Sequence, residues 1–164
     1  MKLIITDLIQ TVKRQPDCEV CDPCGLPLLA SDVELPNDLM TFYENCGGMS
    51  LFIYQQYMFS IVSPKSMVLA NPVLIGDLCE EDISSKWYII GKYNNNNYVS
   101  IDLAKERLGR CYDSFWDRHG VACSCTIVAS SFTQLLTRLF DNKGKSIFWL
   151  DKNFSYIGDA YDNS

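Results

Sequence analysis

Residues 35–48 constrain the fold of this chain more than any other segment. They read Leu-Pro-Asn-Asp-Leu-Met-Thr-Phe-Tyr-Glu-Asn-Cys-Gly-Gly. Pro36 suits the first position of a helix, because its missing N–H would have no partner there, and Asp38 puts a negative charge where the helix dipole favours one. Gly47 is expected to end the helix in a left-handed conformation, and Gly48 to continue the turn. The apolar residues fall at helical spacing and share one face: Leu39, Phe42 and Tyr43.

Periodicity elsewhere predicts two more helices and several strands. Residues 3–14 carry apolar side chains at helical spacing. Residues 131–141 carry a longer apolar stripe, and Ser131 and Gln134 form a capping box at its start. Four asparagines at 94–97 suit a hairpin loop, since Asn tolerates a positive φ. Strands are expected from the apolar runs at residues 51–54, 58–62, 87–93, 98–102, 110–115 and 146–150.

The remaining segments read as connections. Residues 15–34 are rich in Cys, Pro, Asp and Gly and predict a loop, residues 64–84 are mixed, and residues 151–164 form an acidic C-terminal segment. The chain has 164 residues, enough for one core-bearing domain. We therefore expect one α+β domain over residues 1–164, with a central antiparallel or mixed β-sheet of about five to six strands flanked by helices.

Charge is distributed unevenly along the chain. The net charge is −6, and residues 15–64 contain seven carboxylates and no Lys or Arg. Such a chain should be repelled by a phosphate backbone, so nucleic-acid binding is not expected. The acidic third either steers the chain toward a basic protein partner or is a solvated face that keeps the protein soluble.

No targeting or membrane segment is evident in the sequence. Asp7 and Gln10 break the first apolar stretch, so it does not form the core of a signal peptide. Residues 45–64 carry no charge, but glycines, glutamines and Pro64 interrupt them, which argues against a membrane span. Eight cysteines without an export signal are expected to be reduced thiols. We therefore expect a cytoplasmic protein that does not bind a membrane.

Short motifs follow one another in a fixed order from residue 35 to the end of the chain. They are residues 35–48, 87–90, 98–102, 109–113, 129–136, 149–150 and 158–162. In this order they resemble the SUKH superfamily, which includes yeast cell-wall-assembly regulators and many bacterial immunity proteins. The resemblance implies an α+β fold and a protein that acts by binding another protein. Residues 15–34 depart from it, because the family often has a helix-rich, Glu-bearing segment there.

Three cysteines form a C-x-x-C-x-x-C run at Cys18, Cys21 and Cys24. Two residues between thiolates allow one turn to present both to a tetrahedral metal. The alternatives are reduced loop cysteines or a Cys18–Cys24 redox pair. Because the sequence has neither a second C-x-x-C nor a His pair, we expect no metal or cofactor, and a zinc-stabilised interaction module remains an alternative. Further ligands would have to come from Cys46, Cys123 or Cys125.

An acidic cluster is a candidate binding site for a protein partner. It comprises Asp77, Glu80, Glu81 and Asp82 and is followed by Trp87. Carboxylates near an exposed aromatic side chain would suit a cationic partner, because aromatic residues often anchor interfaces. The alternative interpretation is a solvated loop.

One short segment raises the question of catalysis. His119 follows Asp117 and precedes Cys123, which are the residue types of a Cys/His hydrolase. Such an enzyme needs nucleophile, base and orienting group to meet in space, and this spacing does not require that they meet. We therefore predict that the chain is not an enzyme.

These observations favour a protein-binding function. The resemblance implies an immunity protein that neutralises a toxin, in some cases a nuclease, and the acidic charge fits a basic toxin domain. The mechanism expected is stoichiometric binding through an acidic surface. A regulator or scaffold of cell-wall synthesis is the alternative within the same family.

Overall fold

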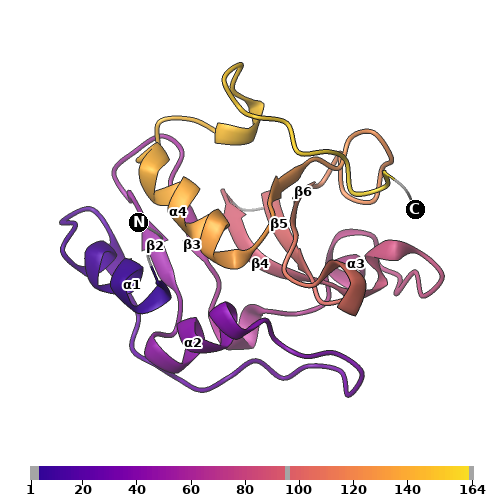
Figure 1. Ribbon diagram of the computed structural model, residues 1–164, viewed down its shortest axis with the longest axis horizontal. Coiled ribbons are helices and arrows are strands. Elements are labelled where there is room, and N and C mark those ends of the chain that lie inside the picture. The colour runs from indigo at the N-terminus through magenta and orange to yellow at the C-terminus, as the bar shows by residue number, and fades with distance from the viewer. Residues whose placement is uncertain (1–3, 95–96, 163–164) are drawn as a thin grey trace.

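A seven-stranded antiparallel sheet forms the centre of the computed structural model, which describes residues 4–94 and 97–162 (Figure 1). Each strand pairs with the next one in the sequence, so the order across the sheet is the order along the chain. The strands are β1 (Glu19–Val20), β2 (Met49–Leu51), β3 (Phe59–Ile61), β4 (Trp87–Tyr93), β5 (Asn97–Asp102), β6 (Cys111–Phe115) and β7 (Ile127–Ala129).

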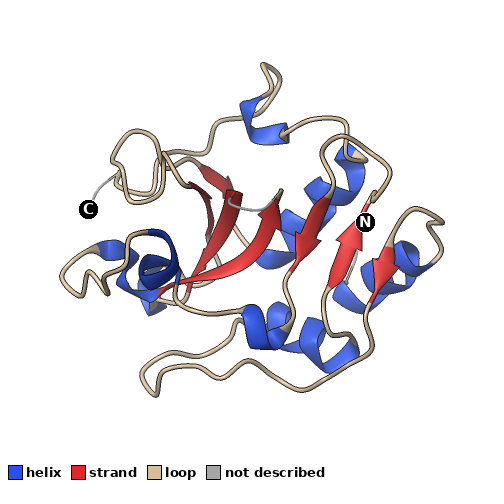
Figure 2. Ribbon diagram, turned by 180° about the vertical axis from the view of Figure 1, so that it is seen from behind, coloured by secondary structure: helices blue, strands red, loops and turns tan. Residues whose placement is uncertain are grey.

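Helices cover the two faces of this sheet unequally. Three of them contact one another on one face: α1 (Ile5–Lys13), α2 (Asn37–Asn45) and α4 (Phe132–Asn142). They lie in front of the strands in Figure 1 and behind them in Figure 2. The short helix α3 (Ala70–Leu74) packs beside β4 and lies in front of the sheet in Figure 2. The described residues also form four 3₁₀ turns: η1 (Pro64–Ser66), η2 (Ile83–Lys86), η3 (Lys105–Arg107) and η4 (Phe148–Leu150).

Residues 35–48, the segment that most constrains the predicted fold, also connect α2 to α4. Asp38 lies in the first turn of α2, and its Oδ2 accepts hydrogen bonds from the backbone N–H and the hydroxyl of Thr133, at 2.8 and 2.9 Å. Phe42 packs edge-on against Phe132, with ring centroids 4.8 Å apart. One carboxylate and one aromatic pair therefore place the start of α4 against α2.

The two glycines after α2 have different constraints from those expected. Gly48, not Gly47, adopts the positive φ, at +108°. At Gly47 there is no room for a larger residue, because a Cβ there would overlap the carbonyl oxygen of Asp22. The helix ends on Cys46 in an extended conformation, so the chain turns one residue later than predicted.

The predicted α+β fold class is confirmed. The sheet has seven strands, one more than the upper end of the predicted range of five to six. The sequence missed β1 and β7, which are only two and three residues long, and it missed α3 within the mixed segment. The strand predicted at residues 146–150 is wrong, because that segment contains the 3₁₀ turn η4. Of the predicted hairpin loop, Asn95 and Asn96 lie outside the described residues.

The capping box of the last helix is present with one change of partner. Ser131 Oγ accepts a hydrogen bond from the backbone N–H of Gln134 at 3.1 Å. The side chain of Gln134 returns one residue earlier than expected, and accepts from the backbone N–H of Ser130 at 2.7 Å. The first bond satisfies one of the N–H groups that the start of a helix leaves without a partner, and the second satisfies the N–H of the residue before the N-cap.

A buried carboxylate holds β4, β5 and the turn after β5 together. Asp102 is fully buried, and its Oδ2 accepts hydrogen bonds from Tyr112 OH at 2.6 Å, Arg107 Nε at 2.8 Å and Trp87 Nε1 at 3.1 Å. Its Oδ1 accepts from the backbone N–H of Ala104 at 3.0 Å. A buried charge with four donors is stable only while that set is complete.

Replacing this carboxylate tests its role. We expect Asp102→Asn to lower the free energy of unfolding by about 3–5 kcal/mol, because the amide cannot accept from three donors and leaves the Arg107 guanidinium without its buried partner. Urea unfolding at pH 7 measures the change. Asp141→Asn, an exposed control on α4, should change it by less than about 0.5 kcal/mol. A loss for Asp102→Asn as small as that of the control would contradict this account.

Candidate functional site

Trp87 lies inside the protein, which corrects the expectation of an exposed aromatic beside the acidic cluster. Its side chain is fully buried and stacks on Tyr112, with ring centroids 4.2 Å apart. Its position at the first residue of β4 directs the ring into the layer between the sheet and the loops that cover this face. Trp87 therefore supports the candidate surface from beneath and does not contact a partner itself.

Asp82 is also committed to the protein's own structure. It caps η2, where its Oδ2 accepts from the backbone N–H of Ser84 at 3.0 Å and from the Ser84 hydroxyl at 2.5 Å. The same oxygen accepts from Tyr161 OH at 2.8 Å. Partial burial acts to raise the pKa of Asp82, but the hydrogen bonds from Ser84 and Tyr161 outweigh it and lower that pKa. Within the acidic cluster, Asp82 therefore has a structural role that sets it apart from Asp77, Glu80 and Glu81.

A chain of buried polar side chains continues from Ser84 to the sheet. The Ser84 hydroxyl accepts from Asn71 Nδ2 at 2.9 Å, and Asn71 Oδ1 lies 2.6 Å from His119 Nε2. The other ring nitrogen, His119 Nδ1, lies 2.9 Å from the hydroxyl of Ser114, which is 2.6 Å from that of Ser100. This series of hydrogen-bonded side chains connects α3, the loop after β6 and the middle of the sheet.

The C-terminal segment is attached through Asp159. This carboxylate is buried and accepts hydrogen bonds from the backbone N–H groups of Cys123 at 3.1 Å, Cys125 at 2.8 Å and Tyr161 at 3.0 Å. The segment also covers the edge of the sheet, because the N–H of Ile127 donates to the carbonyl of Gly158. Three segments that are far apart in the sequence are thus held together as one surface.

We call this surface the acidic end and define it as residues 71–82, 116–124 and 156–162. It lies at the right of Figure 1, around α3 and the C-terminus. Its formal charge is −6, the same as that of the whole chain, because it contains seven carboxylates and a single cation, Arg118. The carboxylates are Asp77, Glu80, Glu81, Asp82, Asp117, Asp159 and Asp162.

The one cation of the acidic end is turned inward. Arg118 Nε lies 2.6 Å from Oδ2 of the buried Asp113, and its guanidinium stands 4.3 Å over the ring of Phe115. Trp149 Nε1 donates to the same carboxylate oxygen at 3.1 Å. Arg118 Nη1 also lies 3.6 Å from Oδ1 of the exposed Asp117. Arg118 is therefore shared between buried Asp113 and Asp117, and among the exposed carboxylates of the acidic end it is paired with Asp117.

The exposed carboxylates lie on the connection between α3 and η2 and on its neighbours. Asp77, Glu80 and Glu81 are exposed, as are Asp117 and Asp162. Asp77 Oδ1 accepts from the backbone N–H of Cys79 at 3.2 Å. Within residues 4–94 and 97–162, Glu80 and Glu81 have no hydrogen bond or ion pair. Their charges are therefore available to a partner.

Cys18 and Cys21 flank β1, and Cys24 lies in the irregular segment after it. Cys18 Sγ accepts from the backbone N–H of Phe52 at 3.4 Å, while Cys21 and Cys24 are exposed. Among the described residues, no group of three or more His, Cys, Asp or Glu side chains is arranged to hold a metal ion. Burial raises the pKa of Cys46 to about 11 and that of Cys125 to about 12, so these thiols are protonated at neutral pH.

His119 occupies a packing position. Both ring nitrogens face hydroxyl or amide oxygens of Ser114 and Asn71 and neither faces a cysteine, and the side chain is only 6% exposed. Burial lowers its pKa to about 4, although the charge of Asp82 acts in the opposite direction. The imidazole is therefore neutral at physiological pH and bonded at both ends.

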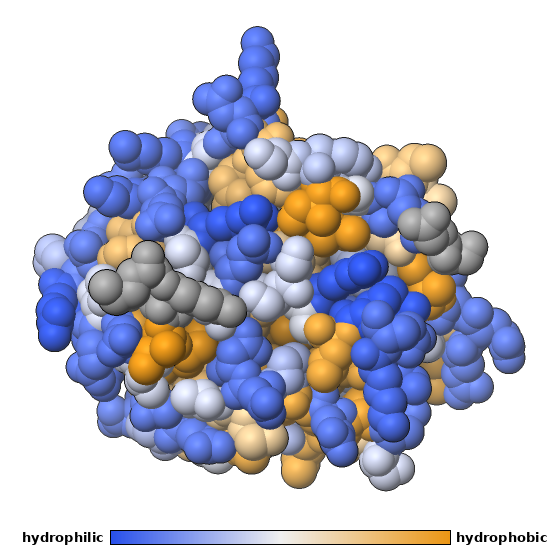
Figure 3. All heavy atoms as spheres, viewed as in Figure 1, coloured by the Kyte–Doolittle hydropathy of each residue, from blue (hydrophilic) through white to orange (hydrophobic). Residues whose placement is uncertain are grey.

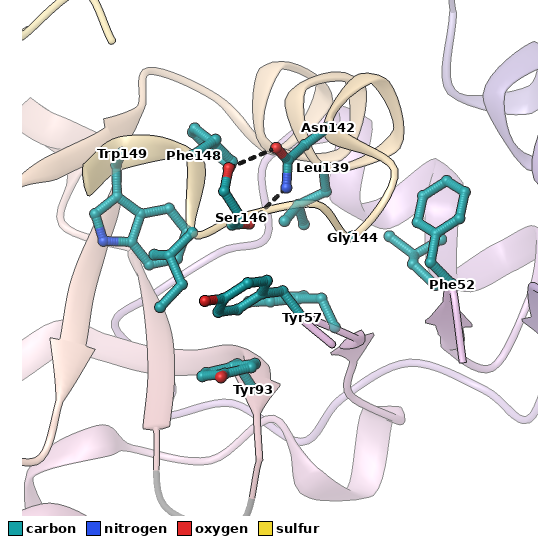
Figure 4. A pocket seen from close by; sticks show the side chains of 12 residues that line it. Phe52, Tyr57, Tyr93, Leu139, Asn142, Gly144, Ser146, Phe148 and Trp149 are labelled. Atoms are coloured by element: carbon teal, nitrogen blue, oxygen red, sulfur yellow. Dashed lines mark hydrogen bonds between the residues drawn. The ribbon is translucent and has the colours of Figure 1, made fainter. Parts of the chain in front are cut away.

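A small pocket lies between α4, η4 and the β2–β3 connection (Figure 4). Tyr57, Tyr93 and Trp149 line it, and Asn142 and Ser146 close one side through hydrogen bonds of 2.6 and 3.0 Å. Its free volume of about 10 Å³ is roughly that of one water molecule. This is a packing gap and has no room for a small-molecule ligand.

Comparisons with known proteins identify the family of this chain. The model of the SMI1 / KNR4 family (SUKH-1) matches residues 30–138. The chain belongs to this family, as its motifs predicted. It is 46% identical to a protein of Bacillus subtilis (strain 168) named Immunity protein YokJ, over 155 residues that make up 94% of each chain. No solved structure matches significantly.

The structure adds acidic residues that the sequence analysis did not group together. Asp117 and Asp162 lie far from Asp77 in the sequence and reach the same end through the polar chain and Asp159. The motif at residues 158–162 was the available signal, since it contains both Asp159 and Tyr161. Within the described part of the chain, no helix has the length and apolar character needed to cross a membrane.

The buried imidazole predicts a pH dependence of stability. Its pKa is about 6.5 in the unfolded chain and about 4 in the native protein, so the unfolded state binds the extra proton between these values. The stabilisation is complete above pH 6.5 and is lost as the pH falls toward 4, by about 3 kcal/mol. Urea unfolding from pH 7 to pH 4.5 should show a steeper loss for the native protein than for His119→Gln. Equal slopes would contradict a neutral buried His119.

Proposed function

We propose that this chain is an immunity protein that neutralises a toxin by binding it stoichiometrically in the cytoplasm, with no catalytic step. The observation that carries the proposal is the 46% identity to a named immunity protein along nearly the whole length of both chains. Two features of the structure support it. The thiols of Cys46 and Cys125 are protonated, and the neutral His119 is hydrogen-bonded inside the core. The acidic end has the same formal charge as the whole chain.

The partner we propose is a basic toxin domain, and a nuclease is one class that fits. An enzyme that grips nucleic acid needs a cationic cleft, and the acidic end presents carboxylates without a free cation among them. We propose that Asp77, Glu80 and Glu81 contact such a cleft and occlude it. A lasting complex of this kind would bury about 1,600 Å² in total.

Co-expression with a candidate toxin domain, sought among the products of the genes that neighbour the one for this chain, tests the function. We expect the chain to restore growth of cells that make the toxin domain, and to form a 1:1 complex with it on size-exclusion chromatography. Stoichiometric action predicts that one equivalent abolishes toxin activity and that excess adds nothing. Turnover of a toxin or of its product by a substoichiometric amount of the chain would contradict the proposal, as would a failure to bind.

Charge reversal tests the proposed surface. We expect Glu80→Lys/Glu81→Lys to lower the association rate with the toxin domain at least about tenfold at low salt, and to flatten its salt dependence, because exposed charges steer association. The control Glu44→Lys/Asp141→Lys changes the net charge equally at the exposed ends of α2 and α4. Stopped-flow binding measures both. Equal losses in the two variants would show that only net charge matters, and would contradict a site at Glu80 and Glu81.

A further inference from the structure

The acidic end also carries large apolar side chains in contact with solvent. Seven of them are between 41% and 72% exposed. We call them the apolar cluster: Val73, Ile75, Leu78, Trp116, Val121, Tyr156 and Ile157. Figure 3 shows apolar residues beside strongly hydrophilic ones at the right of the molecule. Single exposed apolar residues are ordinary, but several on one surface point to an interaction site.

The members of this cluster come from all three segments of the acidic end. All three segments meet at Gly120, because a Cβ added there would lie 3.7 Å from Ile75 Cδ1 and 3.8 Å from Tyr161 OH. Val121 follows Gly120 directly. Tyr156 and Ile157 precede Gly158, whose carbonyl pairs with the edge of the sheet. The apolar side chains thus share the same supports as the carboxylates around them.

This surface is fixed before any partner arrives. Asn71 and His119 join the first segment to the second at 2.6 Å, Asp82 and Tyr161 join the first to the third at 2.8 Å, and Asp159 accepts from Cys123 N–H at 3.1 Å to join the second to the third. Each link is between side chains or backbone groups that are at least partly buried. A surface held in this way loses little conformational entropy on binding, which favours affinity.

The combination of groups defines the chemistry of the partner. Stable interfaces have an apolar centre that excludes water and a polar rim, and a few central side chains supply most of the binding energy. On the acidic end the candidate centre is the apolar cluster, and the exposed carboxylates Glu80, Glu81 and Asp162 belong to the same segments. The complementary face is apolar in the middle and ringed by Lys and Arg.

We infer that the apolar cluster is the energetic centre of the interface with the toxin, and that the toxin domain presents exposed apolar side chains surrounded by cations. This inference rests on the proposed function and adds a division of labour to it. The carboxylates set the association rate, and the apolar cluster sets the lifetime of the complex.

Two kinds of variant separate these roles. Ile75→Ser/Val121→Ser should weaken binding of the purified toxin domain by at least about thirtyfold, almost entirely through faster dissociation, and leave the association rate within about threefold of the native value. The control Tyr54→Ser/Met58→Ser removes two exposed apolar side chains from the β2–β3 connection, at the opposite end of the molecule in Figure 1. It should leave both rates unchanged. Surface plasmon resonance at several salt concentrations measures all of them.

A second variant guards against misfolding. Tyr156→Ser alters a side chain that is 66% exposed, and should raise the dissociation rate at least about fivefold while urea unfolding stays native-like. The inference is overturned if the native chain binds the toxin domain and neither variant changes its dissociation. If the native chain does not bind the toxin domain in the same assay, the proposed function itself fails.

Self-association is the other way in which this cluster could be covered. Analytical ultracentrifugation of the native chain and of Ile75→Ser/Val121→Ser distinguishes self-association from binding of a toxin domain. We expect both to be monomeric at micromolar concentration. A native dimer that the variant dissociates would overturn the inference, because the cluster would then be the contact between two copies of this chain.

Discussion

Three buried carboxylates determine how this protein holds together. An ionised group in the interior is stable only when several donors surround it, and Asp102, Asp113 and Asp159 each accept at least three hydrogen bonds. They follow or lie within β5, β6 and the C-terminal segment, the places where the chain must return to the sheet. Each carboxylate therefore fixes a turn whose conformation the hydrophobic core alone would not specify.

The surface follows from this interior arrangement. Donors to Asp102 and Asp82 include Trp87 and Tyr161, whose rings lie 6.2 Å apart. His119 packs edge-on against the same Trp87, with centroids 5.7 Å apart. The loops of the acidic end thus rest on one buried aromatic platform. In this way seven carboxylates are held on one surface that contains a single Arg and no Lys.

The sequence predicted those parts of the fold that depend on local patterns. The helical stripes predicted α1, α2 and α4, and apolar runs predicted β4, β5 and β6, because these elements are long enough to carry a recognisable pattern. The strands β1 and β7 are too short for that, and Phe148–Leu150 has the composition of a strand but packs as a 3₁₀ turn. Of the residues that the sequence analysis named for the candidate site, some are exposed as expected and others are not. Glu80 and Glu81 were named correctly as exposed acids, whereas Trp87 was misplaced because its burial depends on Tyr112 and Asp102, which are distant in the sequence.

The two acidic regions of this chain differ in how the structure places their carboxylates. Residues 15–64 have many carboxylates, but these are spread over several elements, and Asp38 is used to join α2 to α4. The acidic end combines charge, exposed apolar area and rigid support on one surface. That combination is what a protein interface requires, and it favours the acidic end as the place where a toxin domain docks.

Hydrogen–deuterium exchange of the chain with and without the toxin domain tests this claim most directly. The account predicts slower exchange on binding in residues 71–82, 116–124 and 156–162 together, with no change in residues 52–58. Protection confined to residues 15–64, or a toxin domain that binds without protecting the acidic end, would contradict it.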